Sequence, residues 1–329
     1  MEPELSLVIP FCDVDLYLSA CLDSVAAQTL EDLEVLMVDD GSTDGSRKVA
    51  EGYARSDGRF RLIHQDNRGP GAARNLGLRR TRGRYIGFVD SDDVVPPNAF
   101  ERLVDTLRET GSDIACGGVR RFNSVTEWES PLHAGVFDRE VARTHITRDP
   151  ALLKDRTVWN KVYRRSFWQT HDFTYPEHPY EDGIVAVSAH VLATAVDLVP
   201  EPVYFWRQRD AGPLSITQQI FEPKNLDGRM RQVRAISDFL GARAPALRDA
   251  YDLAALEHDL IILLTTAAHL GPGHRDDVLS FTRTFLAGVP AGVTDRLGAE
   301  NVECYALLRD RRTPDLFRHL RGRQHNVLL

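Results

Sequence analysis

Short apolar runs alternate with segments of helical spacing along the first third of the chain. The runs are rich in β-branched and other apolar residues, and they predict strands at residues 5–10, 33–38, 59–64, 85–89 and 114–119. Between the strands, apolar residues three and four positions apart predict helices, which lie at 15–28, 44–55, 71–81 and from Pro97 onward. Asp44 can cap the second helix, and Pro97 suits the first turn of the fourth. The alternation predicts an α/β fold with a mostly parallel sheet flanked by helices.

The second part of the chain has a less regular pattern and becomes almost wholly helical. Residues 181–195 have helical spacing, and residues 202–207 are predicted to be extended. After Phe221 nearly every segment has helical spacing, with an apolar stripe at Leu247, Tyr251, Leu256, Leu260 and Leu263. We therefore expect a boundary near residue 220, between an α/β domain at 1–220 and a helical region at 221–329.

The composition is that of an ordinary globular protein, with 43% hydrophobic and 27% charged residues. The formal net charge of −8 argues against a general nucleic-acid-binding protein, which is usually basic. The cysteines form no C-x-x-C pair and are expected to be reduced. The N-terminus lacks an apolar run, and the longest apolar stretch, 260–268, is too short to cross a bilayer. These features predict a cytoplasmic protein.

Polar residues follow three of the predicted strands at their carboxyl ends. The first strand ends in Pro10-Phe11, Asp39–Ser42 follow the second, and Asp90–Asp93 follow the fourth. Open parallel sheets bind ligands at this edge, so we expect the three clusters to share one site. The Asp-x-Asp arrangement in the last cluster suits Mg²⁺ or Mn²⁺, with a substrate diphosphate supplying further ligands. A turn that caps the next helix is the alternative for that segment.

Two further segments combine polar groups with a predicted helix start. Residues 67–75 enter a helix whose first N–H groups, together with Arg74, are suited to approach a phosphate. This segment lacks the glycine pattern of a dinucleotide-binding or P-loop motif. Glu181-Asp182 begins another helix, where a carboxylate can act as a general base if the fold returns it to the sheet edge. The plainer interpretations are a capped surface helix and an acidic pair favoured by the helix dipole.

Taken in order, these segments resemble those of the family 2 glycosyltransferases of the GT-A fold. The matching residues are Val8–Phe11, Val38–Asp44, Asn67–Asn75, Phe88–Asp93, Trp159–Arg164 and Tyr180–Gly183. The resemblance covers residues 4–215 and fades after Thr217, which implies a GT-A catalytic domain over 1–220. The segments 160–161 and 204–215 look like those of bacterial capsule and wall teichoic acid glycosyltransferases.

The resemblance also implies roles for individual residues. Asp182 matches the catalytic base, and Glu181 its neighbour near the sugar or acceptor. Asp92 matches the direct metal ligand and Asp90 its partner, so Mn²⁺ or Mg²⁺ is the expected cofactor. Nucleotide-sugar contacts are expected from Pro10, Phe11, Asp40, Asn67, Arg74, Asp90, Ser91, Arg207, Arg209 and Ser215. Of these, Pro10 and Asp40 match the positions that hold the base, normally uracil; for the arginines at 207 and 209 a solvated strand face is the alternative.

The implied reaction is the inverting transfer of a sugar, of the glucose or N-acetylhexosamine type, from a UDP-sugar donor to a hydroxyl. The expected acceptor is a polymeric or lipid-linked cell-wall or surface glycan such as wall teichoic acid. A capsule or exopolysaccharide glycosyltransferase and a non-catalytic sugar-nucleotide-binding protein are the alternatives. A nicotinamide-dependent enzyme is disfavoured by the missing glycine fingerprint.

A basic run lies near the end of the helical region. It consists of Arg309, Arg311, Arg312, Arg318, Arg321 and Arg323. Such a run suits peripheral contact with an anionic polymer or with the inner face of the membrane, and a solvated helix face is the equal alternative. The helical region itself is expected to pack on the catalytic domain, with acceptor binding and a homo-oligomer as the alternatives.

Overall fold

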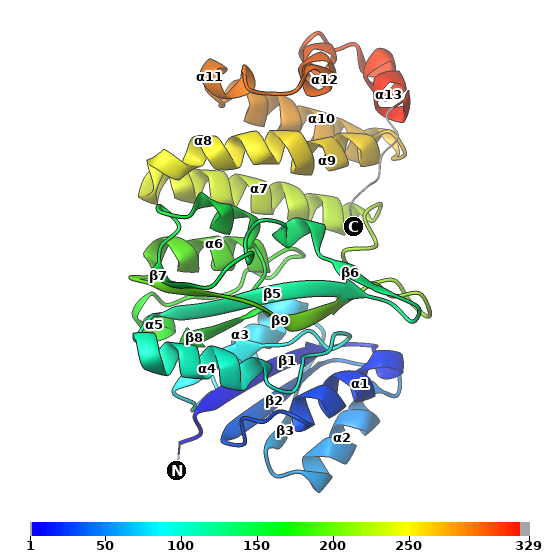
Figure 1. Ribbon diagram of the computed structural model, residues 1–329. Helices are drawn as coiled ribbons and strands as arrows, with labels where there is room; N and C mark the ends of the chain where they lie inside the picture. Colours follow the sequence, from blue (N-terminus) through cyan, green and yellow to red (C-terminus); the bar gives the residue numbers. More distant parts are fainter. Residues whose placement is uncertain (1, 323–329) are drawn as a thin grey trace. The chain divides into compact units, whose positions relative to one another are not determined.

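The computed structural model describes residues 2–322, and the chain divides into two compact units between Leu214 and Ser215. The first unit contains the sheet, and the second is helical (Figure 1). The boundary expected near residue 220 falls inside the second unit, before its first long helix.

The first unit is built on one sheet in the order β3-β2-β1-β4-β8-β5-β9-β7, with β6 paired to β5. Its strands are β1 Leu5–Phe11, β2 Leu33–Asp40, β3 Phe60–Gln65, β4 Tyr85–Phe88, β5 Ile114–Phe122, β6 Glu127–Glu129, β7 Val141–Thr144, β8 Lys161–Arg164 and β9 Val196–Arg207. Strands β3, β2, β1 and β4 pair in parallel, and so do β5 and β9. Because β8 is antiparallel to both β4 and β5, the carboxyl ends of β1, β2, β4, β5 and β9 share one edge. The predicted α/β fold class is confirmed.

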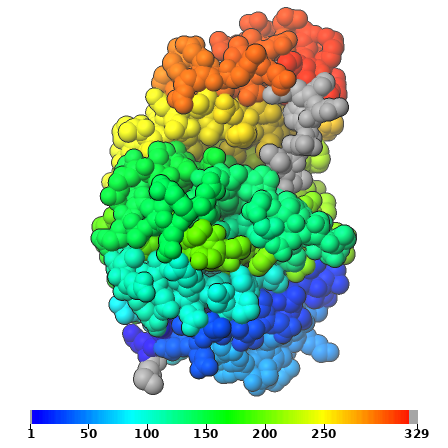
Figure 2. Space-filling model, viewed as in Figure 1, coloured from blue at the N-terminus to red at the C-terminus, as the bar shows by residue number. Residues whose placement is uncertain are grey.

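Helices cover both faces of this sheet. They are α1 Asp15–Ala26, α2 Ser46–Ser56, α3 Pro70–Leu78, α4 Ala99–Thr110, α5 Arg165–Thr170 and α6 Asp182–Leu192, with short 3₁₀ turns at Pro131–His133 and Pro150–Lys154. Right-handed crossovers put α1 and α2 on one face and α3 on the other, as Figure 1 shows. Figure 2 shows the segments before α3, in blue, gathered at one end of this unit.

The helix predicted to follow Asp44 starts one residue later than expected, and the helix predicted to contain Pro97 in its first turn starts two residues after that proline. The second helix begins at Ser46, and Asp44 precedes it while accepting a hydrogen bond from the Ser46 N–H at 2.9 Å. The fourth begins at Ala99, because Pro97 belongs to the preceding loop, where its carbonyl accepts a hydrogen bond from the N–H of Thr29 at 2.8 Å.

The strand order reverses between β1 and β4, which makes this the topological switch point of the parallel half of the sheet. Pairing between the two strands ends at Val8 and Phe88, whereas β1 continues through Pro10 and Phe11. Proline therefore removes no ladder hydrogen bond on that side. A switch point opens a crevice at the carboxyl ends of its strands, where open α/β sheets bind ligands.

In its described part, the regular secondary structure of the second unit consists of helices alone, as predicted. Its helices are α7 Pro223–Arg243, α8 Pro245–Ala254, the π-helical η3 Ala255–Asp259, α9 Leu260–Ala267, α10 Pro272–Ala287, α11 Ala291–Thr294, α12 Ala299–Arg309 and α13 Thr313–Gly322. All five residues of the predicted apolar stripe are buried. Across residues 2–322, none of the helices combines the length and apolarity that a membrane crossing requires. In the basic run, Arg312 and Arg318 pair with Asp315, and Arg323 lies outside the described residues.

Candidate active site

Asp40 ends β2 and fixes the loop that leads into α3. Its buried carboxylate accepts hydrogen bonds from the side-chain amide of Gln65 at 2.7 Å and from the backbone N–H groups of Arg68 and Gly69 at 2.9 and 2.7 Å. The two oxygens of a carboxylate have about four acceptor positions, so these three hydrogen bonds leave one of them unused.

Arg74, on α3, joins two of the predicted acidic segments. Its guanidinium donates from Nη2 to Oδ1 of Asp90 at 2.5 Å and from Nη1 to Oε1 of Glu181. The side chain is only 4% exposed and lies against the ring of Tyr175, and its Nε has no hydrogen-bond partner among the described residues. Residues at 90 and 181, far apart in sequence, are thus brought to one buried cation.

The segment before α6 is held against α3 by matched hydrogen bonds. Asn75 donates to the carbonyl of Tyr175 at 2.8 Å and accepts from its N–H at 2.9 Å. Gly71 permits this approach, because a Cβ there would lie 2.2 Å from the carbonyl oxygen of Pro176. Tyr180 has φ +62°, a left-handed conformation that costs a bulky residue energy and is concentrated at functional sites. The hydrogen bonds of Asn75, the close approach at Gly71 and the left-handed conformation of Tyr180 therefore fix the backbone just before Glu181.

Glu181 and Asp182 start α6, and both have raised pKa values. Burial raises the pKa of Asp182 to about 7, and the negative charge of Glu181 adds to the effect. Burial also raises the pKa of Glu181, although the ion pair with Arg74 opposes the shift. A carboxylate with a pKa near neutrality is suited to accept a proton from a hydroxyl.

The acidic loop after β4 is organised by Tyr204, a fully buried residue of β9. Its hydroxyl accepts a hydrogen bond from the N–H of Asp90 at 2.9 Å and donates one to Oδ2 of Asp93 at 2.8 Å. The ring stacks on Trp159, with centroids 4.1 Å apart. Burial and the neighbouring aspartates raise the pKa of Asp93 well above its usual range.

Arg207 and Arg209, at and just after the end of β9, face this loop. Arg207 donates through Nε to the carbonyl of Asp92 at 2.5 Å, and Arg209 donates through Nε to Oδ2 of the same residue at 2.7 Å. Both guanidinium groups lie near the ring of Tyr17, at 5.0 and 5.4 Å from its centroid. Their contacts are to the aspartate loop, which differs from the solvated strand face of the alternative interpretation.

Asp90 and Asp92 offer the oxygen ligands of a divalent cation, but not a complete set. Across residues 2–322 there is no group of three or more His, Cys, Asp or Glu side chains that could hold a metal ion. A substrate diphosphate and water would have to supply the other ligands, as is usual for Mg²⁺. Burial and the charge of Asp90 raise the pKa of Asp92, so the loop carries a charge repulsion that a cation would relieve.

The remaining predicted residues are less central in this geometry. Asn67 is exposed and donates through Nδ2 to Sγ of Cys12 at 3.2 Å, and Ser91 is 8% exposed within the acidic loop. Ser215 belongs to the second unit, where its hydroxyl donates to the side chain of Gln218 at 2.9 Å.

Sequence reasoning missed the supporting residues of the site. Tyr175 and Tyr17 were not singled out, and Tyr204 was named only as the first residue of the matching segment 204–215, because nothing in their spacing distinguishes a packing tyrosine from one that orients an aspartate. The sequence signal that could have identified Tyr204 is its position shortly before Arg207 and Arg209, at the end of a strand.

The Trp159–Arg164 segment contains a buried charge network. Lys161, fully buried, donates through Nζ to Oδ1 of Asp155 and to the Thr157 carbonyl, both at 2.6 Å, and to the Asn160 side chain at 2.7 Å. His190, near the end of α6, contacts the other oxygen of Asp155 at 3.2 Å. The network connects α6 to β8. Asn160 and Lys161 therefore help to hold α6, which begins at Asp182, in position.

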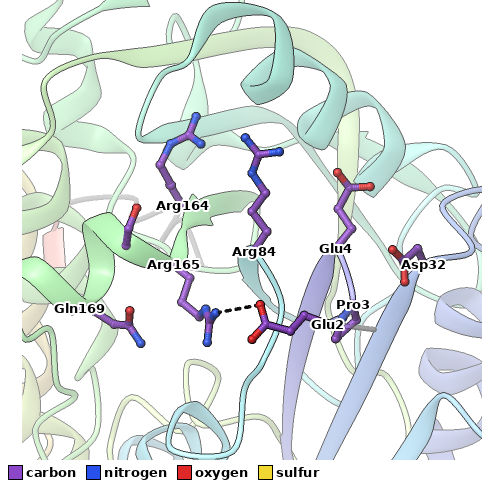
Figure 3. A pocket seen from close by; sticks show the side chains of 9 residues that line it. Glu2, Pro3, Glu4, Asp32, Arg84, Arg164, Arg165 and Gln169 are labelled. Atoms are coloured by element: carbon purple, nitrogen blue, oxygen red, sulfur yellow. Dashed lines mark ion pairs between the residues drawn. The ribbon is translucent and has the colours of Figure 1, made fainter.

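A separate pocket of about 490 Å³ lies at the opposite edge of the sheet (Figure 3). Glu4, Asp32 and Arg84, which line it, immediately precede β1, β2 and β4. Arg165 and Glu2 pair across it at 3.7 Å. This pocket is therefore remote from the carboxyl edge that carries the acidic loop.

Comparison with known proteins agrees with this arrangement. Residues 6–170 match the family described as Glycosyl transferase family 2. The chain is 33% identical over 218 residues to EpsH of Bacillus subtilis (strain 168), which covers 62% of this chain and 61% of EpsH. It is 30% identical over 297 residues to EpsJ of the same organism, covering 87% of this chain and 84% of EpsJ. Both proteins are named as glycosyltransferases.

A third relative is the poly(ribitol-phosphate) beta-glucosyltransferase of Bacillus spizizenii, 29% identical over 70% of this chain and 36% of that protein. Among solved structures, S. aureus TarS 1–349 in complex with UDP superimposes with a TM-score of 0.74. That likeness covers 96% of this chain and 90% of the TarS chain at 19% identity, and so concerns the fold.

Proposed function

Since the chain belongs to glycosyl transferase family 2, we propose that it transfers a sugar from a UDP-sugar to an acceptor hydroxyl with inversion at C1. The observation that carries this proposal is the bridge from Arg74 to Asp90 and Glu181. This bridge joins the acidic loop at the switch point to the start of α6. It brings the guanidinium of Arg74 together with Asp90, a proposed metal ligand, and with the segment that carries Asp182, the candidate base. Glucose or an N-acetylhexosamine is the proposed sugar.

Asp182 is the proposed base. The acceptor O–H loses its proton to this carboxylate while the oxygen attacks C1, the bond from C1 to the diphosphate oxygen breaks, and UDP leaves. A single base with attack opposite the leaving group gives inversion and needs no covalent sugar–enzyme intermediate. Glu181, held by Arg74, lies next to the base and is assigned to the sugar or acceptor.

Asp92 and Asp90 are the proposed ligands of Mn²⁺ or Mg²⁺. When bound, the cation supplies positive charge against the developing charge of the diphosphate. Arg207 and Arg209, next to the same loop, are assigned to the diphosphate, since arginine N–H groups match phosphate oxygens. Asp40 and Pro10, at the ends of β2 and β1, are assigned to the uracil base, and Phe11, Asn67 and Ser91 to the remainder of the donor.

We assign the acceptor to hydroxyl-bearing cell-wall or surface polymers. The support is the poly(ribitol-phosphate) beta-glucosyltransferase, whose similarity spans 70% of this chain. The catalytic function is assigned to residues 1–220, and the helical region to a supporting role.

A donor panel tests the proposal. UDP-, GDP-, dTDP- and CDP-sugars are incubated with Mn²⁺ or Mg²⁺, with EDTA as the metal-free control, and nucleotide release is measured. Metal-dependent turnover of one UDP-sugar is expected, and Asp182→Asn should lose turnover but keep UDP binding. A wild-type protein that neither binds UDP by calorimetry nor turns over any donor would refute the proposal in favour of a non-catalytic role.

A further inference from the structure

Arg121 is a buried arginine, 2% exposed, that forms no ion pair within residues 2–322. In the same part of the chain its guanidinium makes no hydrogen bond, and its Nε is fully buried. Burial lowers the pKa of Arg121, and the negative charge of Asp93 opposes the shift. Buried charges are normally paired, because an isolated charge is costly to remove from water. An arginine left in this condition indicates that the partner is a ligand.

Two tryptophans flank this arginine on one face of the sheet. Arg121 on β5 is in register with Trp128 on β6 and with Trp206 on β9, so the three residues form a row across neighbouring strands. The guanidinium carbon lies 4.4 Å from the Trp206 ring centroid and 5.8 Å from that of Trp128. Both tryptophans are partly exposed. The row therefore places a buried guanidinium between two partly exposed tryptophan rings.

The row lies at the carboxyl edge of the sheet, as does the candidate active site. Trp206 is two residues beyond Tyr204, on the same face of β9, and its ring is 5.7 Å from Trp159. Trp159 stacks on Tyr204, which holds the acidic loop. In Figure 1, β6 lies beside the end of β5. Strand β9 pairs with the other edge of β5. The position is on the far side of the acidic loop from β2, where the proposed base-binding residue Asp40 lies.

We propose that Arg121, Trp128 and Trp206 form an acceptor subsite that binds an anionic group, a phosphate or a carboxylate, of the acceptor chain. The planar guanidinium can bind such a group through two parallel N–H···O bonds, and the rings offer apolar surface to the adjoining carbon skeleton. The inference rests on the proposed transfer function. It narrows the acceptor class to a polymer with charged repeats.

The neighbouring Arg120 is the matched control. It points to the other face of β5, where it pairs with Glu127 and Glu129. Its charge is thus already neutralised within the protein, one residue from Arg121. Loss of Arg120 removes the same charge from the same strand without removing the proposed ligand contact.

The test measures anion binding with the donor site already filled. Tryptophan fluorescence is titrated with glycerol 3-phosphate, glucuronate or uncharged glycerol, in saturating UDP and Mn²⁺ so that the diphosphate site is not available. We expect saturable binding of one or both anions but not of glycerol, weakened about tenfold or more in Arg121→Gln and unchanged in Arg120→Gln. Arg121→Met, whose side chain can fill the space between the rings, is the second variant, and UDP affinity reports folding of both.

Three results would overturn the inference: no anion binding by the wild-type protein, equal binding of glycerol, or wild-type affinity in a folded Arg121 variant. Loss of the anion with UDP binding retained is the supporting result. A wild-type protein that binds UDP but no anion refutes this inference alone, whereas failure to bind UDP refutes the proposed function.

Discussion

Arg209 holds Asp92 in an ion pair, with Nε 2.7 Å from Oδ2 and each side chain 14% exposed. Oδ2 of Asp92, the proposed metal ligand, is thus already paired with the guanidinium of Arg209. A divalent ion that binds through this oxygen has to displace the guanidinium, which becomes available to the diphosphate. Under the proposed assignments, the pair would link metal binding at Asp92 to the position of the arginine assigned to the diphosphate.

Arg209→Gln is therefore expected to strengthen Mn²⁺ binding in the absence of donor. The substitution releases Oδ2 of Asp92 and removes one positive charge. The Kd for Mn²⁺ should therefore fall roughly fivefold, which corresponds to about 1 kcal/mol of binding free energy. Calorimetry or manganese EPR without nucleotide provides the measurement. Arg207→Gln is the control, because its side chain donates to the backbone carbonyl of Asp92 and not to its carboxylate, and a smaller change is expected. Equal changes in both variants would mean that charge, not displacement, controls the affinity.

Transfer should depend on pH through Asp182. Its pKa is raised from 3.8 to about 7, so the carboxylate is largely protonated below neutrality. As the proposed base it must be ionised, and kcat/KM is expected to fall about tenfold per pH unit below 7 and to level off above it. A profile that is flat between pH 5 and 8 would argue against Asp182 as the base.

Asp182→Asn should separate activity from stability. A raised pKa means that the folded chain holds a proton that the unfolded chain releases, so stability declines as pH rises from about 4 through about 7. The asparagine variant lacks this ionisation and is expected to unfold a few degrees higher at pH 8, with transfer reduced about 10²–10⁴-fold. Thermal unfolding at pH 5 and pH 8 gives the comparison, since the difference should shrink at the lower pH.

The parallel half of the fold was predictable because its signals are local. Each strand of β1 to β4 is a short apolar run, and the residues that follow β1, β2 and β4 meet at one edge by the geometry of parallel sheets. The position of Asp90–Asp93 at this edge could therefore be predicted from the order of strands and helices along the chain. The antiparallel β8, inserted between β4 and β5, has no comparable local signal, because its position depends on tertiary pairing.

The joining of Glu181 to Arg74 could not be derived from spacing. It depends on Asn75 and Tyr175, whose paired hydrogen bonds bring together segments 100 residues apart. The resemblance to a known family implied that both residues belong to one site, but it did not predict their ion pair, and the residues alone left Glu181-Asp182 as a helix start. Arg121 was missed altogether, because a sequence shows a charge but not the absence of its partner.

Tyr204→Phe is expected to destabilise the protein and loosen the acidic loop. The change leaves the Asp90 N–H and a buried oxygen of Asp93 without partners, at a cost of about 1–3 kcal/mol. Urea unfolding measures the loss. Tyr163→Phe is the matched control, since that buried hydroxyl has no hydrogen-bond partner in the described part of the chain, and the change should be neutral or stabilising. Equal losses in both variants would remove Tyr204 from its assigned role.

Gly71→Ala is expected to disable transfer while leaving most of the fold intact. An added methyl group would lie 2.2 Å from the Pro176 carbonyl oxygen and 3.1 Å from Cγ of Glu181, so the segment that carries the proposed base must move. Displacement by about 1 Å can lower the rate about 10²-fold, whereas UDP affinity, which we assign to the ends of β1, β2 and β9 and to the aspartate loop, should change little.

Gly52→Ala provides the control for this substitution. Gly52 lies within α2, and an added Cβ there meets no atom within 4 Å, so alanine should stabilise the helix by about 0.5–1 kcal/mol without changing transfer. Rates and UDP binding measured on both variants separate a steric effect on the 176–182 segment from a general effect of replacing glycine in a helix. Full activity in Gly71→Ala would show that the close approach of α3 to this segment is not needed to position Asp182.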